Sequence, residues 1–155
     1  MATTFIKYKD NKGFYISEIF IQLAMHYINS EVKKILYSFS EKQEIVEDLQ
    51  DNINGECNGY LVLYWKYILN GISDEQTMIK VLQNVNITLQ QKGTSISIAE
   101  LNAVETDDSD FKRFFSRKPF PTAELVKIID ALILILQGTW DFDNYDMKID
   151  YGYYD

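Results

Sequence analysis

The side chains that could carry out catalysis are few, and their spacing matches no catalytic motif. The one histidine, His26, and the one cysteine, Cys57, would have to act together as base and nucleophile. His26 follows Leu23 by three residues at the flank of an apolar helical stripe, so we interpret it as a partly buried structural side chain. Cys57 has no other candidate base, and we interpret it as an ordinary small residue.

Metal-binding spacings are also incomplete. A di-iron helical bundle needs a Glu-x-x-His pair on each of two helices, and this chain has one histidine. Asp141 and Asp143 resemble the start of a calcium loop, but the glycine and the final glutamate of such a loop are missing. We therefore expect no metal, no cofactor and no enzyme activity. An enzyme with an unfamiliar site, centred on His26 or on a buried carboxylate, stays open as the third alternative.

Acidic residues are gathered in three clusters, which are the clearest chemical feature of the chain. The net charge is −8, yet residues 41–56 carry −5, residues 100–110 carry −5 and residues 141–155 carry −4, so the remainder is +6. Such clusters repel nucleic acid and anionic membranes, and they attract a basic surface. We expect a basic protein partner, with no direct binding to nucleic acid and no membrane contact.

The last acidic cluster alternates aspartates with aromatic rings. Carboxylates and flat rings together can substitute for the phosphates and bases that a nucleic-acid groove contacts, and tyrosine and tryptophan are common interface anchors. We predict an ordered acidic-aromatic segment over residues 140–155. The predicted partner-binding residues are Asp141, Phe142, Asp143, Tyr145, Asp146, Asp150, Tyr151, Tyr153, Asp107 and Asp108. The alternative is that this segment docks on its own domain, with Trp140 and Phe142 in the core and the aspartates in solvent.

The composition is that of a chain with a packed core. Its 155 residues are 46% hydrophobic and 25% charged, which predicts one folded domain over residues 1–155. A single cysteine gives no sign of an oxidising compartment, and the N-terminal residues show no basic segment followed by an apolar run. The longest apolar run, residues 128–136, is too short to cross a membrane. We predict a soluble, cytoplasmic protein.

Helical spacing of apolar residues dominates the middle of the chain. With the cap signals it predicts helices over Phe14–Asn29 with a continuation to Phe39, from Ser40 through Leu49, from Ser73 to Gly93, from Ser97 through Val104, and over Thr122–Gln137 with a stop at Gly138. The stretch 60–69 fits a strand by composition and a helix by its length and flanks, and we choose helix.

The two chain ends differ from the helical middle. Segments 4–9 and 147–154 are rich in strand formers and partly alternate between apolar and polar residues. The predicted fold is therefore mainly α, a compact multi-helix bundle, and we keep open that the two ends pair as a small β ribbon.

Taken together, a compact, acidic, mostly helical chain with no catalytic set resembles the immunity proteins of bacterial contact-dependent growth inhibition. The resemblance implies binding to a cognate protein toxin, often a nuclease, and occlusion of its active site or substrate groove. It carries no diagnostic motif, so no residue role is transferred from it. The alternative is an adaptor or oligomeric scaffold that assembles through aromatic helix faces, especially residues 60–67, and the oligomeric state is left open.

Overall fold

The expectation of a mostly helical chain is confirmed by the computed structural model, which describes residues 2–152. The elements, in chain order, are β1 (Thr3–Lys7), the 3-10 turn η1 (Lys9–Asn11), β2 (Gly13–Ser17), α1 (Glu18–Val32), α2 (Lys42–Ile53), α3 (Trp65–Ile68), α4 (Gly71–Gln91), β3 (Ser95–Ile96), α5 (Ile98–Asn102), α6 (Ser109–Phe114), β4 (Phe120–Pro121), α7 (Thr122–Gln137) and β5 (Tyr145–Asp146).

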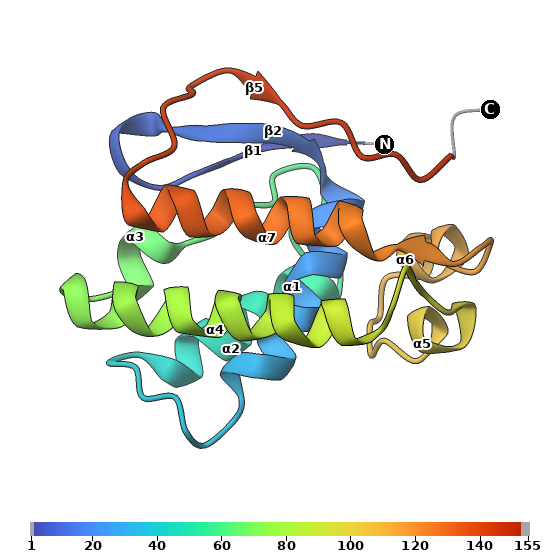
Figure 1. Cartoon of the computed structure of the whole chain (residues 1–155), viewed down its shortest axis with the longest axis horizontal. Coiled ribbons are helices and arrows are strands. Elements are labelled where there is room, and N and C mark those ends of the chain that lie inside the picture. The colour runs from blue at the N-terminus through green and yellow to red at the C-terminus, as the bar shows by residue number, and fades with distance from the viewer. Residues whose placement is uncertain (1, 153–155) are drawn as a thin grey trace.

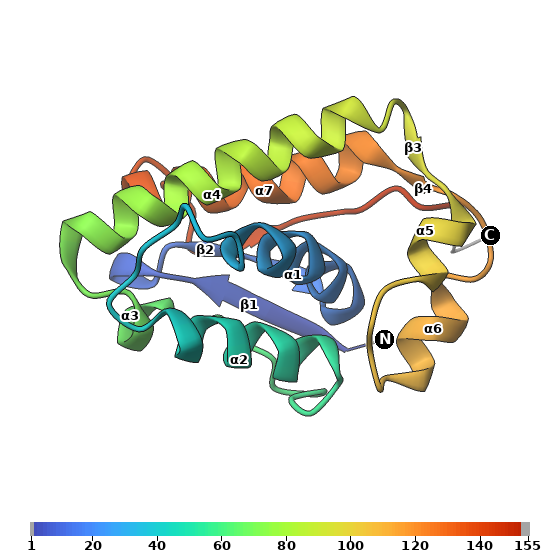
Figure 2. The same ribbon diagram turned by 90° about the horizontal axis from the view of Figure 1, so that it is seen from below.

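The core is built around α1, in which only His26 and Ser30 are not buried. The helices α4 and α7 pack side by side along the long axis of the molecule, and α2 lies on the other side of α1 (Figure 2). The small sheet lies along the side of α7 that is turned away from α4 (Figure 1). Because α1 is covered on so many sides, its sequence is apolar almost all round.

The sheet has the strand order β1-β2-β5, in which β1 and β2 form an antiparallel hairpin and β5 pairs in parallel with β2. Both chain ends therefore contribute to one sheet, although β2 lies between them and they do not pair directly. The strand at the C-terminal end is also shorter and earlier than predicted. Met147, Ile149 and Tyr151 are buried while Lys148 and Asp150 are exposed, so the alternation marks a one-sided extended segment without a strand partner.

The predicted start of the first helix at Phe14 is wrong. Residues 13–17 form β2, in which Phe14 and Ile16 are buried and Tyr15 is exposed, and the helix begins at Glu18. The buried Glu18 carboxylate accepts hydrogen bonds from the backbone N–H of Gly59 at 2.8 Å and of Leu61 at 2.9 Å. An apolar pair two residues apart satisfies a strand as well as a helix, and the hairpin decides between them.

The predicted continuation of the first helix to Phe39 is also wrong. The helix ends at Val32, and Ile35 and Leu36 project into solvent. The chain turns here because Tyr37 is drawn into the core, where its hydroxyl donates to Glu31 at 2.6 Å. An apolar residue at the right spacing is thus no proof of burial when a neighbouring aromatic residue competes for the core.

Helix caps were predicted with mixed success. The Ser97 side chain accepts from the N–H of Glu100 as expected, and α7 has the predicted bounds with Gly138 left-handed at φ 76°. The helix predicted to begin at Ser73 begins at Gly71 instead. Its anchor is Asp74, whose buried carboxylate accepts from the N–H of Asn70 at 2.8 Å and from that of Ser40 at 3.2 Å.

Only part of the helix predicted over residues 60–69 is present, as the single turn α3. The preceding residues are extended because their backbone is bound on several sides. The carbonyl of Leu61 accepts from the Thr4 hydroxyl, and that of Val62 accepts from Asn52 at 3.3 Å. This segment therefore lies against β1, and the tertiary bonds outweigh its helix-compatible flanks.

Asp48 on α2 makes the stability of the fold depend on pH. Burial raises the pKa of its carboxyl to about 6, opposed by a hydrogen bond from the Tyr64 backbone and reinforced by Asp51. Between pH ~4 and ~6 the folded chain therefore binds more protons than the unfolded chain, and stability falls as the pH rises through that window. Because the side chain is partly exposed, we expect Asp48→Asn to raise the free energy of unfolding at pH 7 by about 1 kcal/mol.

Urea unfolding at several pH values measures this effect. The gain from Asp48→Asn should vanish near pH ~4, where the carboxyl is protonated in both states. The matched control is Glu47→Gln, on the same helix but exposed, which should change little at either pH. An equal gain at neutral and acidic pH would show that ionisation of Asp48 is not the cause.

Candidate partner-binding surface

The chain that follows α7 is pinned back onto the hairpin before it forms β5. The indole N–H of Trp140 donates to the carbonyl of Gly13 at 2.8 Å, and the N–H of Gly13 donates to the carbonyl of Phe142 at 2.9 Å. Gly13 is required here because a Cβ at this position would lie 1.8 Å from the carbonyl oxygen of Ile6. Residues 140–142 are thus held by a backbone contact that larger residues at position 13 would prevent.

Three aromatic rings form a cluster on this pinned segment. The ring centroids of Trp140, Phe142 and Tyr145 lie 5.2 to 5.3 Å from one another, and Trp140 also contacts the buried Phe14 at 5.9 Å. Trp140 is half-buried, whereas Phe142 is 50% exposed and Tyr145 is 40% exposed. The alternative in which Trp140 and Phe142 both enter the core is therefore only half right, because Phe142 remains at the surface.

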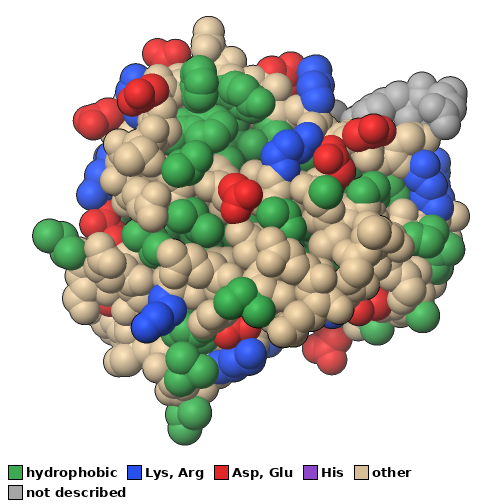
Figure 3. All heavy atoms as spheres, viewed as in Figure 1, with side chains coloured by type: hydrophobic (Ala, Val, Ile, Leu, Met, Phe, Trp, Pro, Cys, Tyr) green, Lys and Arg blue, Asp and Glu red, His purple; other side chains and the backbone are tan. Residues whose placement is uncertain are grey.

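Aspartates surround the ring cluster, and their carboxylates face solvent. Asp141, Asp143, Asp146 and Asp150 are all exposed. Hydrophobic side chains gather over this end of the sheet, with acidic side chains around them (Figure 3). We call Trp140, Asp141, Phe142, Asp143, Tyr145 and Asp146 the acidic-aromatic surface.

The backbone beyond β5 is fixed to α7 by two charged side chains. Lys127 donates to the carbonyl of Lys148 at 2.6 Å and to the carboxylate of Glu124 at 2.9 Å, and the same Glu124 oxygen accepts from the N–H of Asp150 at 2.6 Å. The carboxylates of this segment therefore stay outside while its main chain is anchored. The order predicted for the acidic-aromatic segment has a physical basis as far as residue 152.

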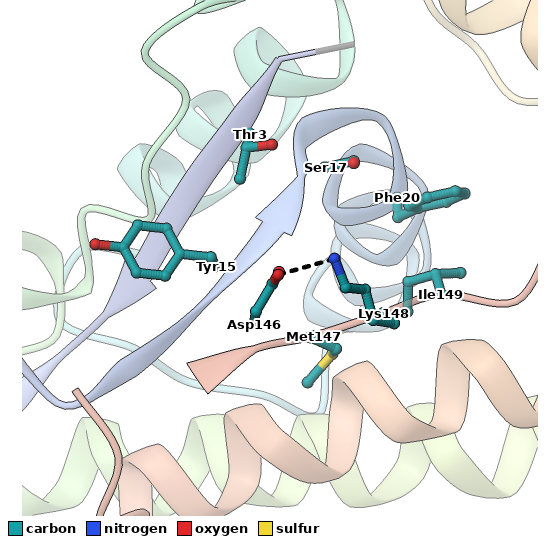
Figure 4. A pocket seen from close by; sticks show the side chains of 8 residues that line it. All are labelled: Thr3, Tyr15, Ser17, Phe20, Asp146, Met147, Lys148 and Ile149. Atoms are coloured by element: carbon teal, nitrogen blue, oxygen red, sulfur yellow. Dashed lines mark ion pairs between the residues drawn. The ribbon is translucent and has the colours of Figure 1, made fainter. Parts of the chain in front are cut away.

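A hollow of about 640 Å³ lies between the hairpin and the segment that follows β5 (Figure 4). Phe20, Met147 and Ile149 are buried side chains that contribute apolar atoms to its lining. Asp146 and Lys148 also line it and form an ion pair of 2.8 Å. The remaining lining residues come from the strands: Thr3, Tyr15 and Ser17. The sequence reasoning did not find them because it placed Tyr15 in a helix, although the alternation of residues 14–16 was the available signal.

Tyr151, predicted to bind the partner, lies in the core instead. It is 2% exposed, and its ring contacts Phe20, Phe114, Phe115 and Phe120 at centroid distances of 5.0 to 6.5 Å. Its hydroxyl donates to the carbonyl of Lys118 at 2.6 Å. The segment after β5 is apolar enough on one face to complete a phenylalanine cluster, so we leave Tyr151 out of the acidic-aromatic surface. Tyr153 lies outside the described residues.

Asp108, also predicted to bind the partner, is a buried N-cap. Its carboxylate accepts from the N–H groups of Asp110 and Phe111 and from the amides of Gln22 and Asn58, all at 3.0 to 3.3 Å. Burial alone would raise the pKa of this carboxyl, but these hydrogen bonds lower it below its usual value. The aspartate-rich sequence therefore includes one carboxylate that the fold itself uses.

Asp107 is exposed but is not part of the acidic-aromatic surface. Its N–H donates to the side chain of Asn54, at the end of α2, at 3.2 Å. The neighbouring α6 lies at the opposite end of the long axis from the turn between β1 and β2, next to which Gly13 holds Phe142 (Figure 1). The structure therefore does not bring Asp107 together with the aspartates that follow α7.

The environments of His26 and Cys57 do not resemble those of a base and a nucleophile. Burial lowers the pKa of the half-buried His26, whose ring packs against Tyr27 at 4.8 Å. Burial and nearby Asp48 and Asp51 raise the pKa of the Cys57 thiol, whereas a nucleophilic cysteine needs a lowered one. Within residues 2–152, no three His, Cys, Asp or Glu side chains are grouped to hold a metal ion, and no helix is both long and apolar enough to cross a membrane.

Comparison of the chain with protein-family models, with curated proteins and with solved structures finds no match.

Proposed function

We propose that this chain is an inhibitor that binds a basic protein partner, as the immunity proteins of contact-dependent growth inhibition bind their toxins. The observation that supports the proposal is the acidic-aromatic surface, where Phe142 and Tyr145 are exposed beside carboxylates on an anchored main chain. Large exposed rings are uncommon on a surface without a partner and are frequent interface anchors. Such an inhibitor of an intracellular toxin acts in the cytoplasm.

The proposed mechanism is occlusion of a basic groove, such as the substrate groove of a nuclease. Carboxylates occupy the positions of phosphates, and the rings of Phe142 and Tyr145 occupy positions where bases would stack. The Gly13 contacts and the Lys127 bridge hold this surface in place before binding. A pre-organised surface loses little conformational entropy on association, which favours a tight complex.

Removing three of the surface carboxylates should slow association with the basic partner. The variant Asp141→Asn, Asp143→Asn, Asp146→Asn removes charges that steer the encounter, and we expect the association rate to fall by about tenfold at low salt. Stopped-flow or surface-binding kinetics over a range of salt concentrations measures the effect, and the salt dependence should flatten in the variant.

The matched control changes three exposed acids on α2: Glu44→Gln, Glu47→Gln and Asp51→Asn. It removes the same number of charges from another acidic cluster, so net charge alone would affect both triple variants equally. Equal slowing in the two variants would argue that the partner does not recognise the acidic-aromatic surface.

The exposed ring of Phe142 should be an affinity anchor. We expect Phe142→Ala to weaken the complex by about 2 kcal/mol, close to thirtyfold in Kd, mainly through faster dissociation. Ile72, which is 74% exposed on α4, supplies the control as Ile72→Ala, with no expected change. If calorimetry gives the same Kd for Phe142→Ala and the unaltered chain, the ring cluster is not at the interface.

A scaffold that assembles with copies of itself is the second candidate function. Tyr60 and Tyr67 are 67% and 70% exposed, and Tyr64 lies 6.2 Å from Tyr67 between ring centroids. These rings lie near α2 and apart from the acidic-aromatic surface. Sedimentation of the pure chain separates the two functions, because a stable homo-oligomer that dissociates on Tyr67→Ala favours the scaffold.

A further inference from the structure

The hollow between the hairpin and the segment after β5 combines an apolar lining with a carboxylate. Phe20, Met147 and Ile149 supply apolar atoms, and Asp146 supplies the charge (Figure 4). An arginine or lysine side chain has the matching character, because its methylene stem packs on apolar atoms while its charged end stays beside a carboxylate. A purely apolar side chain would leave the carboxylate without a partner, and an anion would be repelled by it.

The ion pair between Asp146 and Lys148 already places a cation beside this carboxylate. Its two side chains are 59% and 85% exposed and lie 2.8 Å apart. Pairs this exposed contribute little to stability, so a cation from a partner can exchange with Lys148 at low cost. The main chain of Lys148 is held separately, through its carbonyl, by Lys127, so the side chain can leave without movement of the segment.

An arginine suits this exchange better than a lysine. A guanidinium can bind the Asp146 carboxylate through two parallel hydrogen bonds, which the Lys148 ammonium cannot do. It can also stack on an aromatic ring, and Tyr15, on the wall of the hollow, is 42% exposed. The hydroxyls of Thr3 and Ser17, paired in the strand register, add acceptors for further guanidinium N–H groups.

We infer that this hollow receives an arginine side chain of the basic partner, which displaces Lys148 from Asp146; the inference rests on the proposed function. Successive strand residues point to opposite faces, so Tyr145 and Asp146 direct their side chains to the two sides of β5, the last strand of the sheet order. A partner segment that passes over β5 therefore meets the ring cluster on one side and the arginine hollow on the other.

The test uses small probes on the full chain and needs no partner. Amide chemical shifts are followed by NMR during titration with N-acetyl-arginine amide, and separately with its neutral isostere N-acetyl-citrulline amide and with N-acetyl-leucine amide. We expect saturable shifts at Ser17 and Met147 with the arginine probe alone, in the millimolar range. Equal shifts with citrulline or leucine, or no saturable shift at these residues, would overturn the inference.

Two variants sharpen the result. Asp146→Asn should weaken the arginine probe about tenfold, whereas Asp143→Asn should leave its affinity unchanged. Lys148→Ala removes the competing cation and should tighten the probe by up to about fivefold; weaker binding in this variant would contradict displacement. The probe titration is independent of the partner, so its failure would leave the salt-dependence test of the proposed function unaffected.

Discussion

Replacing Tyr151 with alanine is expected to destabilise the fold by about 3–5 kcal/mol, the range for deleting a large buried aromatic side chain. The ring is 2% exposed among four phenylalanines, and its hydroxyl bonds the Lys118 carbonyl. The loss would open a cavity between the segment after β5 and the phenylalanine cluster. Denaturant unfolding at constant pH measures the effect.

Two further variants separate the contributions of Tyr151. Tyr151→Phe keeps the ring and removes one hydrogen bond, so we expect a loss of about 1 kcal/mol. Tyr145→Ala truncates a tyrosine that is 40% exposed and should cost clearly less stability than Tyr151→Ala. A Tyr151→Ala chain that keeps its stability and loses partner binding would restore Tyr151 to the interface, as its place in the sequence first suggested.

Replacing Asp108 with alanine is expected to cost about 3 kcal/mol of stability. The change removes an N-cap and leaves the amides of Gln22 and Asn58 without their carboxylate acceptor. It should be detected as a lower denaturation midpoint with an unchanged denaturant slope. The matched control is the adjacent, exposed Asp107→Ala, for which we expect a change within about 0.5 kcal/mol.

The lowered pKa of Asp108 gives this prediction a pH signature. A carboxyl whose folded pKa lies below its unfolded value contributes stability that is present above the unfolded pKa and is lost as the pH falls through the folded one. Asp108→Asn, which cannot ionise, should therefore narrow its deficit as the pH is lowered below ~4. A deficit that is constant from neutral to acidic pH would indicate that only the shape of the side chain matters.

The parts of the fold that the sequence predicts well are those that local chemistry decides. The residues Thr122–Gln137 are apolar and end at a glycine, and the Ser97 cap needs only a neighbouring N–H, so neither depends on distant residues. The hairpin residue Phe14 and the surface residue Ile35 were assigned to a buried helix face because their spacing fits one. Their true positions depend on pairing with β1 and on burial of Tyr37, which are tertiary effects that spacing does not contain.

The candidate surface was foreseen in its charges and only partly in its rings. Asp141, Asp143 and Asp146 are exposed as charged residues usually are, and Phe142 remains outside because Gly13 holds its main chain at the edge of the sheet. Tyr151 and Asp108 were assigned to the same set by residue type, and the fold uses both internally. The hollow could not be foreseen, because it forms only where residues distant in sequence, such as Thr3 and Ile149, line one space.

The most direct test of the proposed inhibitor is the salt dependence of association between the chain and a partner captured from its native cells and then purified. We predict a basic partner, a defined complex, and a logarithm of the association rate that falls with the logarithm of salt concentration. The slope should be shallower for the Asp141, Asp143, Asp146 triple variant than for the α2 triple variant. A partner that is not basic, or a slope that is the same for both variants, would contradict binding through the acidic-aromatic surface.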